Sequence, residues 1–348
     1  MSRPLRVAVL LPQVPFQSGG AEILARRLVE AVAAEGHESD LITLPFKWYP
    51  DRVLLESALA WRLLDLSEAN GQPIDVVIAT KYPSYLVQHP RKVVWLFHQF
   101  RQAYDMHGSR FGQFAEDPRG AAMREAIIQA DQRALDEARA VFAISGNVAR
   151  RLARFCDREA EILLPPPQEL PELPGSDEGY VLSVGRLDAA KRLDLLLHAL
   201  SRVDQVKTVI VGEGPEREAL ARLAAGLGLE NRVAFRGRVG PEELARLYGR
   251  CRAVYYAPHD EDYGFVTLEA QLARKPVITA TDSGGPLDFI DHEVTGLVVE
   301  PQPDHVAAAL RRICGDPRLA VRLGESARER IRLLSWEGIA RRLLAAAK

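Results

Sequence analysis

Two glutamates flank a glycine just after an apolar run. Glu261 and Glu269 are separated by seven residues, with Gly264 between them, and the run 254–257 comes just before. The glycine permits a tight backbone turn, and a helix predicted over 266–273 would direct its free N–H groups and positive dipole end at a ligand. A carboxylate beside such an anion site is repelled unless it accepts hydrogen bonds from hydroxyls. The segment therefore indicates a site for a sugar attached to a phosphate.

Glu269 also has a simpler interpretation. It would fall in the first turn of the predicted helix, where a glutamate commonly complements the helix dipole without binding anything. Glu261 is harder to explain in this way, so it carries more of the functional argument.

Two cations follow a second glycine turn. Gly185 ends an apolar run, Arg186 lies in the loop after it, and Lys191 opens the next predicted helix. Arginine offers a planar fork of donors and lysine a point charge, so a diphosphate would fit a pocket that both residues face. The alternative is a pair of solvated surface cations, and these residues alone do not decide between the two.

Further glycine turns precede helices elsewhere in the chain. Gly212 and Glu213 lie in a turn that lets a planar base approach closely, although an ordinary strand-to-helix turn has the same pattern. Arg238 ends the next predicted strand, from which it could close over that base. Gly19 and Gly20 precede the first predicted helix, an arrangement that brings backbone amides to a phosphate.

Bulk composition excludes several classes of protein. The 348 residues suffice for two domains, and 47% apolar with 26% charged residues is typical of a soluble globular chain. A net charge of −2 gives no case for nucleic-acid binding. The three cysteines, at positions 156, 251 and 314, match no metal or redox spacing. No apolar run is long enough to span a membrane, and the first apolar run is interpreted as a strand, so we expect a cytoplasmic protein.

Apolar runs without polar alternation recur between helical patterns, which is typical of parallel sheets covered on both faces. We therefore predict an α/β fold with two Rossmann-like domains whose parallel sheets face each other across a cleft. The predicted parts are an N-terminal domain over 1–165, a proline-rich linker over 166–177, a second domain over 178–330, and a C-terminal helix over 331–348 that packs back toward the N-terminal domain.

Together these segments resemble the family-4 retaining glycosyltransferases of the GT-B fold, and the resemblance covers nearly the whole chain. The matching segments are the glutamate pair at 261 and 269, GRLDAAKR (185–192), GGAE (19–22), DSGGPLDFI (282–290) with TGLVVEP (295–301), and SWEGIARRLL near the end. Each match is weak alone. All of them occur in order and in the expected halves.

The resemblance implies a role for each candidate residue. Arg186 and Lys191 would neutralise a nucleotide diphosphate without a metal or another cofactor, Glu269 would bind the ribose, and Glu261 would hold the hydroxyls of the donor sugar. His98 would lie beside that sugar at the reaction centre, although a packed histidine is the simpler interpretation. Other donor contacts would come from the following residues: Gly19, Gly20, Gly185, Gly212, Glu213, Arg238, Gly264, Phe265, Val266 and Thr267.

The implied reaction transfers a hexose from a nucleotide sugar to a saccharide or a lipid-linked acceptor with retention of configuration. The EDYG sequence at 261–264 resembles mannosyltransferases that use GDP-mannose, and a UDP-sugar donor is the alternative. The loop 97–114, with its aromatic residues, histidines and arginines, would read the acceptor, or is simply a packed loop. Arginines 150, 151 and 154 leave two interpretations open, a solvated helix face or a peripheral contact with the inner face of an anionic membrane.

Three rival functions remain to be weighed. A nucleotide-sugar epimerase shares the architecture and the phosphate site. A catalytically inactive sugar-binding partner is the alternative from another class, although both acids, both cations and His98 are present. A nicotinamide oxidoreductase would need a G-x-G-x-x-G motif after the run 7–11, which the sequence lacks. The acidic triplet 260–262 resembles a metal-binding motif of other transferases, but no second carboxylate cluster accompanies it, and we interpret the match as accidental.

Overall fold

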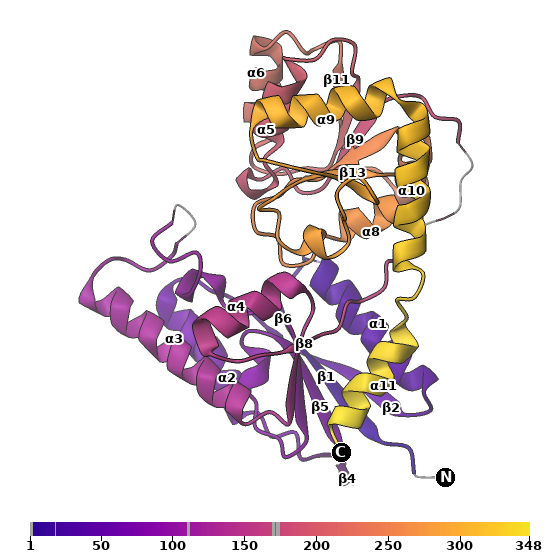
Figure 1. Cartoon of the computed structure of the whole chain (residues 1–348). Coiled ribbons are helices and arrows are strands. Elements are labelled where there is room, and N and C mark those ends of the chain that lie inside the picture. Colours follow the sequence, from indigo (N-terminus) through magenta and orange to yellow (C-terminus); the bar gives the residue numbers. More distant parts are fainter. Residues whose placement is uncertain (1–2, 18, 110–111, 169–170, 172–174) are drawn as a thin grey trace. The chain divides into compact units, whose positions relative to one another are not determined.

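Two separate parallel sheets organise the chain (Figure 1). The computed structural model describes residues 3–17, 19–109, 112–168, 171 and 175–348. One unit comprises Met1–Pro165 and Ser335–Lys348, and the other comprises Pro166–Leu334. The predicted linker and the predicted C-terminal helix thus lie close to the two points where the chain passes between the units.

The first unit is built on a six-stranded sheet of order β2-β1-β5-β6-β7-β8 in which all neighbours are parallel. Its strands are β1 (Arg6–Gln13), β2 (Glu38–Pro45), β5 (Val76–Lys81), β6 (Lys92–His98), β7 (Ala140–Ala143) and β8 (Glu161–Ile162). Its helices are α1 (Gly20–Ala34), α2 (Asp51–Leu63), α3 (Pro118–Asp136), α4 (Gly146–Cys156) and α11 (Trp336–Ala346), with 3-10 turns η1 (Ser84–Leu86) and η2 (Arg101–Ala103). A short antiparallel hairpin, β3 (Glu68–Ala69) and β4 (Gln72–Pro73), stands apart from the sheet.

The second unit repeats the plan with strand order β11-β10-β9-β12-β13-β14. Its strands are β9 (Val181–Val184), β10 (Thr208–Val211), β11 (Val233–Gly237), β12 (Ala253–Tyr255), β13 (Val277–Ala280) and β14 (Gly296–Val299). Its helices are α5 (Leu193–Leu200), α6 (Arg217–Gly226), α7 (Pro241–Arg250), α8 (Phe265–Leu272), α9 (Pro303–Gly315) and α10 (Pro317–Ile331), with 3-10 turns η3 (Ala189–Lys191) and η4 (Gly285–Asp288). Helix α5 packs against α6 and α9, whereas α8 packs against α10.

The apolar runs explain these sheets. In β1 the residues from Val7 to Pro12 are all buried, and in β5 so are those from Val76 to Thr80, because helices cover both faces. Strand β2, at the edge of the sheet, has only exposed and half-buried residues. The predicted α/β class with parallel sheets is confirmed.

One predicted helix is divided in the structure, and two other helical segments end or break at defined points. Helix α2 ends at Leu63, and the hairpin follows it. The helical segment after β9 is interrupted at Arg192, whose backbone is left-handed with φ of 50°. The segment expected as one helix over 331–348 contains the last residue of α10 and then α11, which starts anew because the Ser335 hydroxyl accepts a hydrogen bond from the Gly338 amide.

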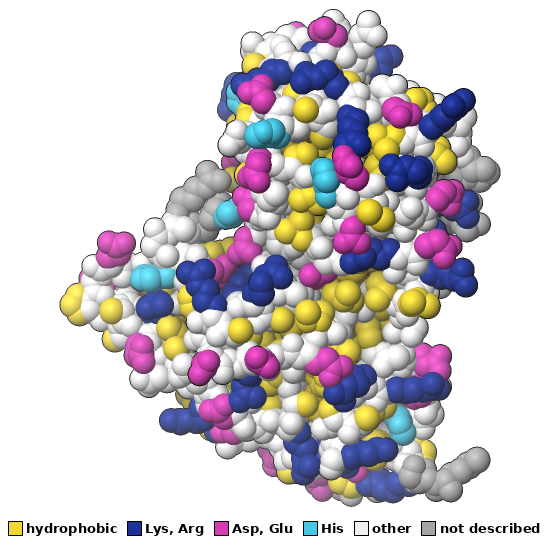
Figure 2. All heavy atoms as spheres, viewed as in Figure 1, with side chains coloured by type: hydrophobic (Ala, Val, Ile, Leu, Met, Phe, Trp, Pro, Cys, Tyr) yellow, Lys and Arg dark blue, Asp and Glu magenta, His cyan; other side chains and the backbone are white. Residues whose placement is uncertain are grey.

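Charged side chains are mixed over the surface. Figure 2 shows lysines and arginines interspersed with acidic side chains over the face in view, and they do not gather into one basic patch. In the part of the chain that the structure describes, no helix is both long enough and apolar enough to cross a bilayer.

The C-terminal helix α11 packs against α1 within the first unit (Figure 1). Ile339, Leu343 and Leu344 of α11 are buried, and the Trp336 ring meets the buried Trp95 edge to face, with 6.1 Å between the ring centroids. The last residues of the chain are therefore part of the core of the first unit.

We predict that Leu343→Ala lowers the free energy of unfolding of the first unit by about 2–4 kcal/mol, because it leaves a cavity under a helix held by apolar packing. All four tryptophans, at positions 48, 61, 95 and 336, lie in this unit, so urea denaturation followed by tryptophan fluorescence reports on it. The control is Arg341→Ala, which removes only exposed ion pairs with Glu35 and Glu337 and should cost less than about 1 kcal/mol. Equal effects of the two substitutions would contradict this packing.

Candidate functional site

The candidate residues follow the strands at which each sheet reverses its order. In the second sheet, β10 and β11 lie on one side of β9, and the next strand in the sequence, β12, lies on the other side. In the first sheet, β1 has β2 on one side and β5 on the other. In open parallel sheets, ligands bind outside the carboxyl ends of the strands at such switch points. Gly185 follows β9 and Gly19 follows β1 after a short loop, so both glycines occupy the expected end of their own sheet.

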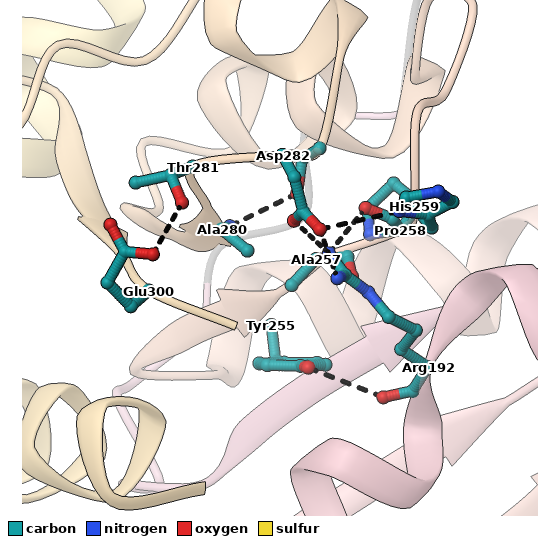
Figure 3. Close-up of polar contacts among 10 residues, drawn as sticks. Arg192, Tyr255, Ala257, Pro258, His259, Ala280, Thr281, Asp282 and Glu300 are labelled. Carbon is teal, nitrogen blue, oxygen red and sulfur yellow. Dashed lines mark hydrogen bonds and ion pairs between the residues drawn. The ribbon is translucent and has the colours of Figure 1, made fainter. Parts of the chain in front are cut away.

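The guanidinium of Arg192 joins three loops of the second unit (Figure 3). It donates two hydrogen bonds to the carboxylate of Asp282, at 2.7 and 2.8 Å, and one each to the carbonyls of Ala257 and Pro258. Burial acts to raise the pKa of Asp282, but the hydrogen bonds and charge of Arg192 outweigh it and hold that pKa below its ordinary value. This four-bond contact, the Arg192 clamp, fixes the turn bearing Lys191 against the ends of β12 and β13.

A backbone ladder then holds Glu261 in place. Its amide donates to the carbonyl of Ser283, and its carbonyl accepts from the amide of Gly285. A Cβ on Gly285 would lie 2.7 Å from backbone atoms of Asp262 and Tyr263, so only glycine allows this approach. The backbone of the DSGGP segment (282–286) thus holds the loop that bears Glu261.

Lys191 and Glu261 form an ion pair, and the hydroxyl of Tyr256 donates to the same carboxylate oxygen at 3.2 Å. The two charged side chains are only 20% and 24% exposed. Burial acts to lower the pKa of Lys191, but nearby Tyr256 and Glu261 outweigh it and raise that pKa, so the ammonium stays charged. The two residues were expected to contact different parts of one ligand, and the structure places them in direct contact with each other.

Arg186 and Lys191 line one small pocket together with Gly185 and Tyr256. The side chain of Arg186 is 69% exposed, and Asp188 lies 3.9 Å from it. Next to Gly185, a Cβ on Gly212 would lie 1.9 Å from the carbonyl oxygen of Gly185, and Gly212 has φ of 130°. The two glycine turns therefore touch backbone to backbone, which no other residue type would allow.

The residues expected near a base lie beside these turns. The amide of Gly212 donates to the carbonyl of Gly237, and the Glu213 carboxylate lies close to the Cα side of Gly237. Arg238, the next residue, is exposed. Glu213 and Arg238 are thus carried by neighbouring loops at the carboxyl ends of β10 and β11.

Glu269 does not lie in the first turn of its helix. Helix α8 begins at Phe265, and its first turn contains no acidic residue. Gly264 precedes it with φ of 91°, and the Thr267 amide donates back to the Gly264 carbonyl. Glu269 lies in the second turn, half-buried, and accepts a 2.7 Å hydrogen bond from the hydroxyl of Tyr248 on α7. The dipole interpretation of Glu269 is therefore wrong, since it required the first turn.

Burial raises the pKa of Glu269, and the Tyr248 hydrogen bond partly opposes that rise. Two more residues expected to touch a ligand, Val266 and Thr267, have buried side chains, so only their backbone groups could do so.

The first unit carries a second polar group at the ends of β1, β5 and β6. The amide of Gly19 donates to Glu22 at 2.8 Å, which is the half of a capping box that a glycine N-cap can form at the start of α1. The other oxygen of Glu22 lies 3.4 Å from the ammonium of Lys81, and both side chains are 12% exposed. Burial lowers the pKa of Lys81, and Glu22 partly offsets that effect. His98 pairs with Lys81 across the two strands, and its Nδ1 lies 2.9 Å from the Gln99 carbonyl.

Two acceptor-side expectations need correction. In the loop 97–114, of which residues 110 and 111 lie outside the described residues, the aromatic side chains of Phe97, Phe100, Tyr104 and Phe114 are buried and pack in the core. Arg151 is also buried and pairs with Asp105, so it does not belong to a membrane-facing surface. Aromatic side chains and an arginine that could have contacted a ligand thus pack inside the first unit.

Sequence reasoning missed four residues that position the candidates: Arg192, Tyr248, Tyr256 and Lys81. Arg192 lies inside the GRLDAAKR segment but was not singled out, and its partner Asp282 opens the DSGGP segment. Tyr256 lies in the apolar run 253–257, where a polar hydroxyl a few residues before Glu261 was a usable signal. Nothing local in the sequence marked Tyr248.

Within the described ranges, no group of three or more histidine, cysteine or acidic residues is arranged to hold a metal ion. Positive charge at this edge of the second unit comes from Arg186, Lys191 and the amino-terminal end of α8. Such an arrangement can bind a multiply charged anion through fixed cations and backbone amides. Its two acids can accept hydrogen bonds from neutral hydroxyl groups attached to that anion.

Comparison with known proteins agrees with this geometry. Residues 170–330 match the family model described as glycosyl transferases group 1. Over 184 residues the chain is 31% identical to human alpha-1,3/1,6-mannosyltransferase ALG2, an alignment that covers 48% of this chain and 44% of that protein. The chain thus spans less than half the length of this curated relative, and the second unit carries a glycosyltransferase group 1 domain.

Solved structures match nearly the whole chain. Sucrose-phosphate synthase from Thermosynechococcus elongatus has a TM-score of 0.77 at 24% identity, covering 98% of this chain and 100% of that one. HepE from Anabaena, solved in complex with UDP and glucose, has a TM-score of 0.67 at 16% identity, covering 97% and 98%. These likenesses confirm the predicted GT-B fold.

We predict that Arg192→Leu destabilises the second unit by about 2–3 kcal/mol, because two carbonyls and one carboxylate lose their donor at once. Calorimetric unfolding would measure the change. The matched control is Arg202→Leu, whose exposed pair with Asp304 should contribute less than about 1 kcal/mol. If both variants unfold alike, the clamp does not hold the site.

Proposed function

We propose that this protein is a retaining, family-4-type glycosyltransferase that transfers a hexose from a nucleotide sugar to a saccharide or a lipid-linked acceptor. The observation that supports this most strongly is the Lys191–Glu261 pair, which lies at a switch point inside a glycosyltransferase group 1 domain. An ammonium suits the diphosphate of the donor, and the carboxylate beside it suits the sugar hydroxyls.

Before the donor binds, these two charges neutralise each other. A diphosphate carries more negative charge than one carboxylate, so it would take over the ammonium of Lys191 from Glu261. The carboxylate would then be free to accept hydrogen bonds from hydroxyls of the sugar, while Tyr256 still donates to it. Binding of the diphosphate thus frees the Glu261 carboxylate to bind the sugar of the same donor molecule.

In the proposed reaction, the bond between the sugar carbon and the diphosphate oxygen breaks, and the acceptor oxygen attacks the same face. The acceptor proton passes to the departing phosphate oxygen. Negative charge grows on the leaving group, where Arg186, Lys191 and the first amides of α8 stabilise it without reorganisation. No step requires a divalent ion, because these groups supply the positive charge.

GDP-mannose is the donor we favour, on the EDYG sequence at 261–264 and the likeness to a mannosyltransferase. A UDP-hexose is the alternative, favoured by the UDP and glucose bound to the Anabaena protein of the same fold. In the first unit, His98 and the Glu22–Lys81 pair are the groups we assign to the sugar and acceptor side.

A thermal-shift screen with GDP, UDP and ADP in EDTA tests the nucleotide assignment. We expect one nucleotide to raise the unfolding temperature of the second unit, because a ligand that binds only the folded state stabilises it. The shift should persist in EDTA, since cations of the chain neutralise the diphosphate. Absence of any shift, or a strict need for magnesium or manganese, would refute the proposed site.

Replacement of Glu261 by glutamine should separate binding from transfer. We expect turnover to fall about a hundredfold or more, a typical cost of removing one preorganised polar group. The dissociation constant of the nucleoside diphosphate should stay the same or decrease, because Lys191 loses its competing partner. The control is Glu300→Gln, which removes an exposed carboxylate bonded to Thr281 (Figure 3). Equal loss of binding and turnover would show that Glu261 has another role.

A further inference from the structure

Both candidate acids are held by tyrosine hydroxyls that come from other elements. Tyr256, directly after β12, donates to Glu261, and Tyr248, in α7, donates to Glu269. The bond to Glu261 shares its oxygen with Lys191, whereas Glu269 has a hydroxyl as its partner and no ion pair among the described contacts. The second acid is thus positioned by a neutral group.

Tyr248 can only donate in this contact. Its side chain is fully buried, and burial together with the neighbouring Glu269 raises its pKa well above the ordinary value. The phenol therefore keeps its proton. It donates one short hydrogen bond, of 2.7 Å, to Oε2 of Glu269. The backbone carbonyl of Tyr248 in turn accepts from the thiol of Cys251.

Glu269 is anchored at one oxygen and half-buried as a whole. A carboxylate has two oxygens with about four acceptor positions, so one bond to Oε2 restricts the rotation of the group and leaves several positions open. Two adjacent hydroxyls of a ligand match the acceptor positions that remain, because each hydroxyl can donate to one oxygen of the Glu269 carboxylate. Without the tyrosine, the carboxylate could turn about its terminal torsion, which has only broad preferences.

We propose that Tyr248 is a positioning residue that orients the Glu269 carboxylate to receive the two neighbouring hydroxyls of the nucleotide ribose. The inference rests on the proposed function, because it assumes that a nucleotide binds the second unit. It adds a residue that touches no ligand but sets the preference for ribose over sugars that lack these hydroxyls.

A purely structural role for Tyr248 predicts a different pattern. Loss of a buried hydrogen bond would then loosen the unit and weaken every nucleotide to the same extent. An orienting role weakens only nucleotides whose ribose hydroxyls reach Glu269. The two roles are therefore separated by comparing a nucleoside diphosphate with its 2′,3′-dideoxy form.

The experiment measures dissociation constants by calorimetry for UDP and GDP and for their 2′,3′-dideoxy forms, with the wild-type chain of 348 residues and its Tyr248→Phe variant. We expect Tyr248→Phe to weaken whichever ribonucleotide binds by about five- to tenfold, a hydrogen-bond-sized effect, and to leave the dideoxy form unchanged. The control is Tyr180→Phe, which removes another buried tyrosine hydroxyl, bonded to the Leu247 carbonyl at 2.7 Å. It should change neither constant.

The pH dependence gives a second readout. Ribose hydroxyls donate to the ionised carboxylate, so affinity falls as pH falls through the pKa of Glu269. The Tyr248 hydrogen bond lowers that pKa, and its removal raises it. In Tyr248→Phe the loss of ribonucleotide affinity on acidification should therefore begin at a higher pH than in the wild type, and Tyr180→Phe should follow the wild type.

Three results would overturn the inference. If Tyr248→Phe weakens ribo and dideoxy forms equally, or matches Tyr180→Phe at every pH, Tyr248 is structural only, and the proposed function stands. If the wild type binds a nucleoside diphosphate but does not distinguish the dideoxy form, Glu269 does not bind the ribose. If neither UDP nor GDP binds the wild type, the proposed function fails together with the inference.

Discussion

The Arg192 clamp is the contact on which the geometry of the second unit's site depends. Lys191 precedes this arginine directly, and the loop bearing Glu261 starts at the carbonyls that the guanidinium holds. Asp282, the third partner of the guanidinium, opens the segment whose backbone runs alongside Glu261. The left-handed backbone at Arg192 has a cost, which is consistent with a side chain that makes four hydrogen bonds. One guanidinium thus sets the separation of the two charges that form the candidate site.

Positive charge at the site is balanced within the unit. Lys191 meets Glu261, and Arg192 meets Asp282, so the partly buried cations here have acidic partners. Paired charges lose less free energy on leaving water than isolated ones. Arg186, in contrast, is mostly exposed, with its carboxylate neighbour at 3.9 Å. A ligand anion would therefore find one cation already in place and one that has to turn toward it.

The sequence predicted the architecture better than the internal contacts of the site. Uninterrupted apolar runs implied parallel sheets. The glycine turns placed Gly185 and Gly212 directly after strands, and Gly19 and Gly264 directly before helices, as the structure has them. The contacts that orient the acids could not be predicted in this way, because they join positions far apart. Lys191 and Tyr256 are 65 residues apart, and Arg192 and Asp282 are 90 apart. The turn occupied by Glu269 depended on whether α8 starts at 265 or later, and helix ends are hard to fix without the capping geometry.

The passage of the chain from one unit to the other and back has a consequence for dissecting the protein. Pro166–Leu334 is one continuous stretch with its own six-stranded sheet. It is inserted into the first unit, whose last helix, α11, comes after the insertion. A fragment ending at Pro165 would leave the outer face of α1 bare to water, with the indole of Trp95 lacking its aromatic neighbour. The middle segment is thus a self-contained module, whereas the flanking pieces need each other and are better joined by a short engineered bridge than expressed apart.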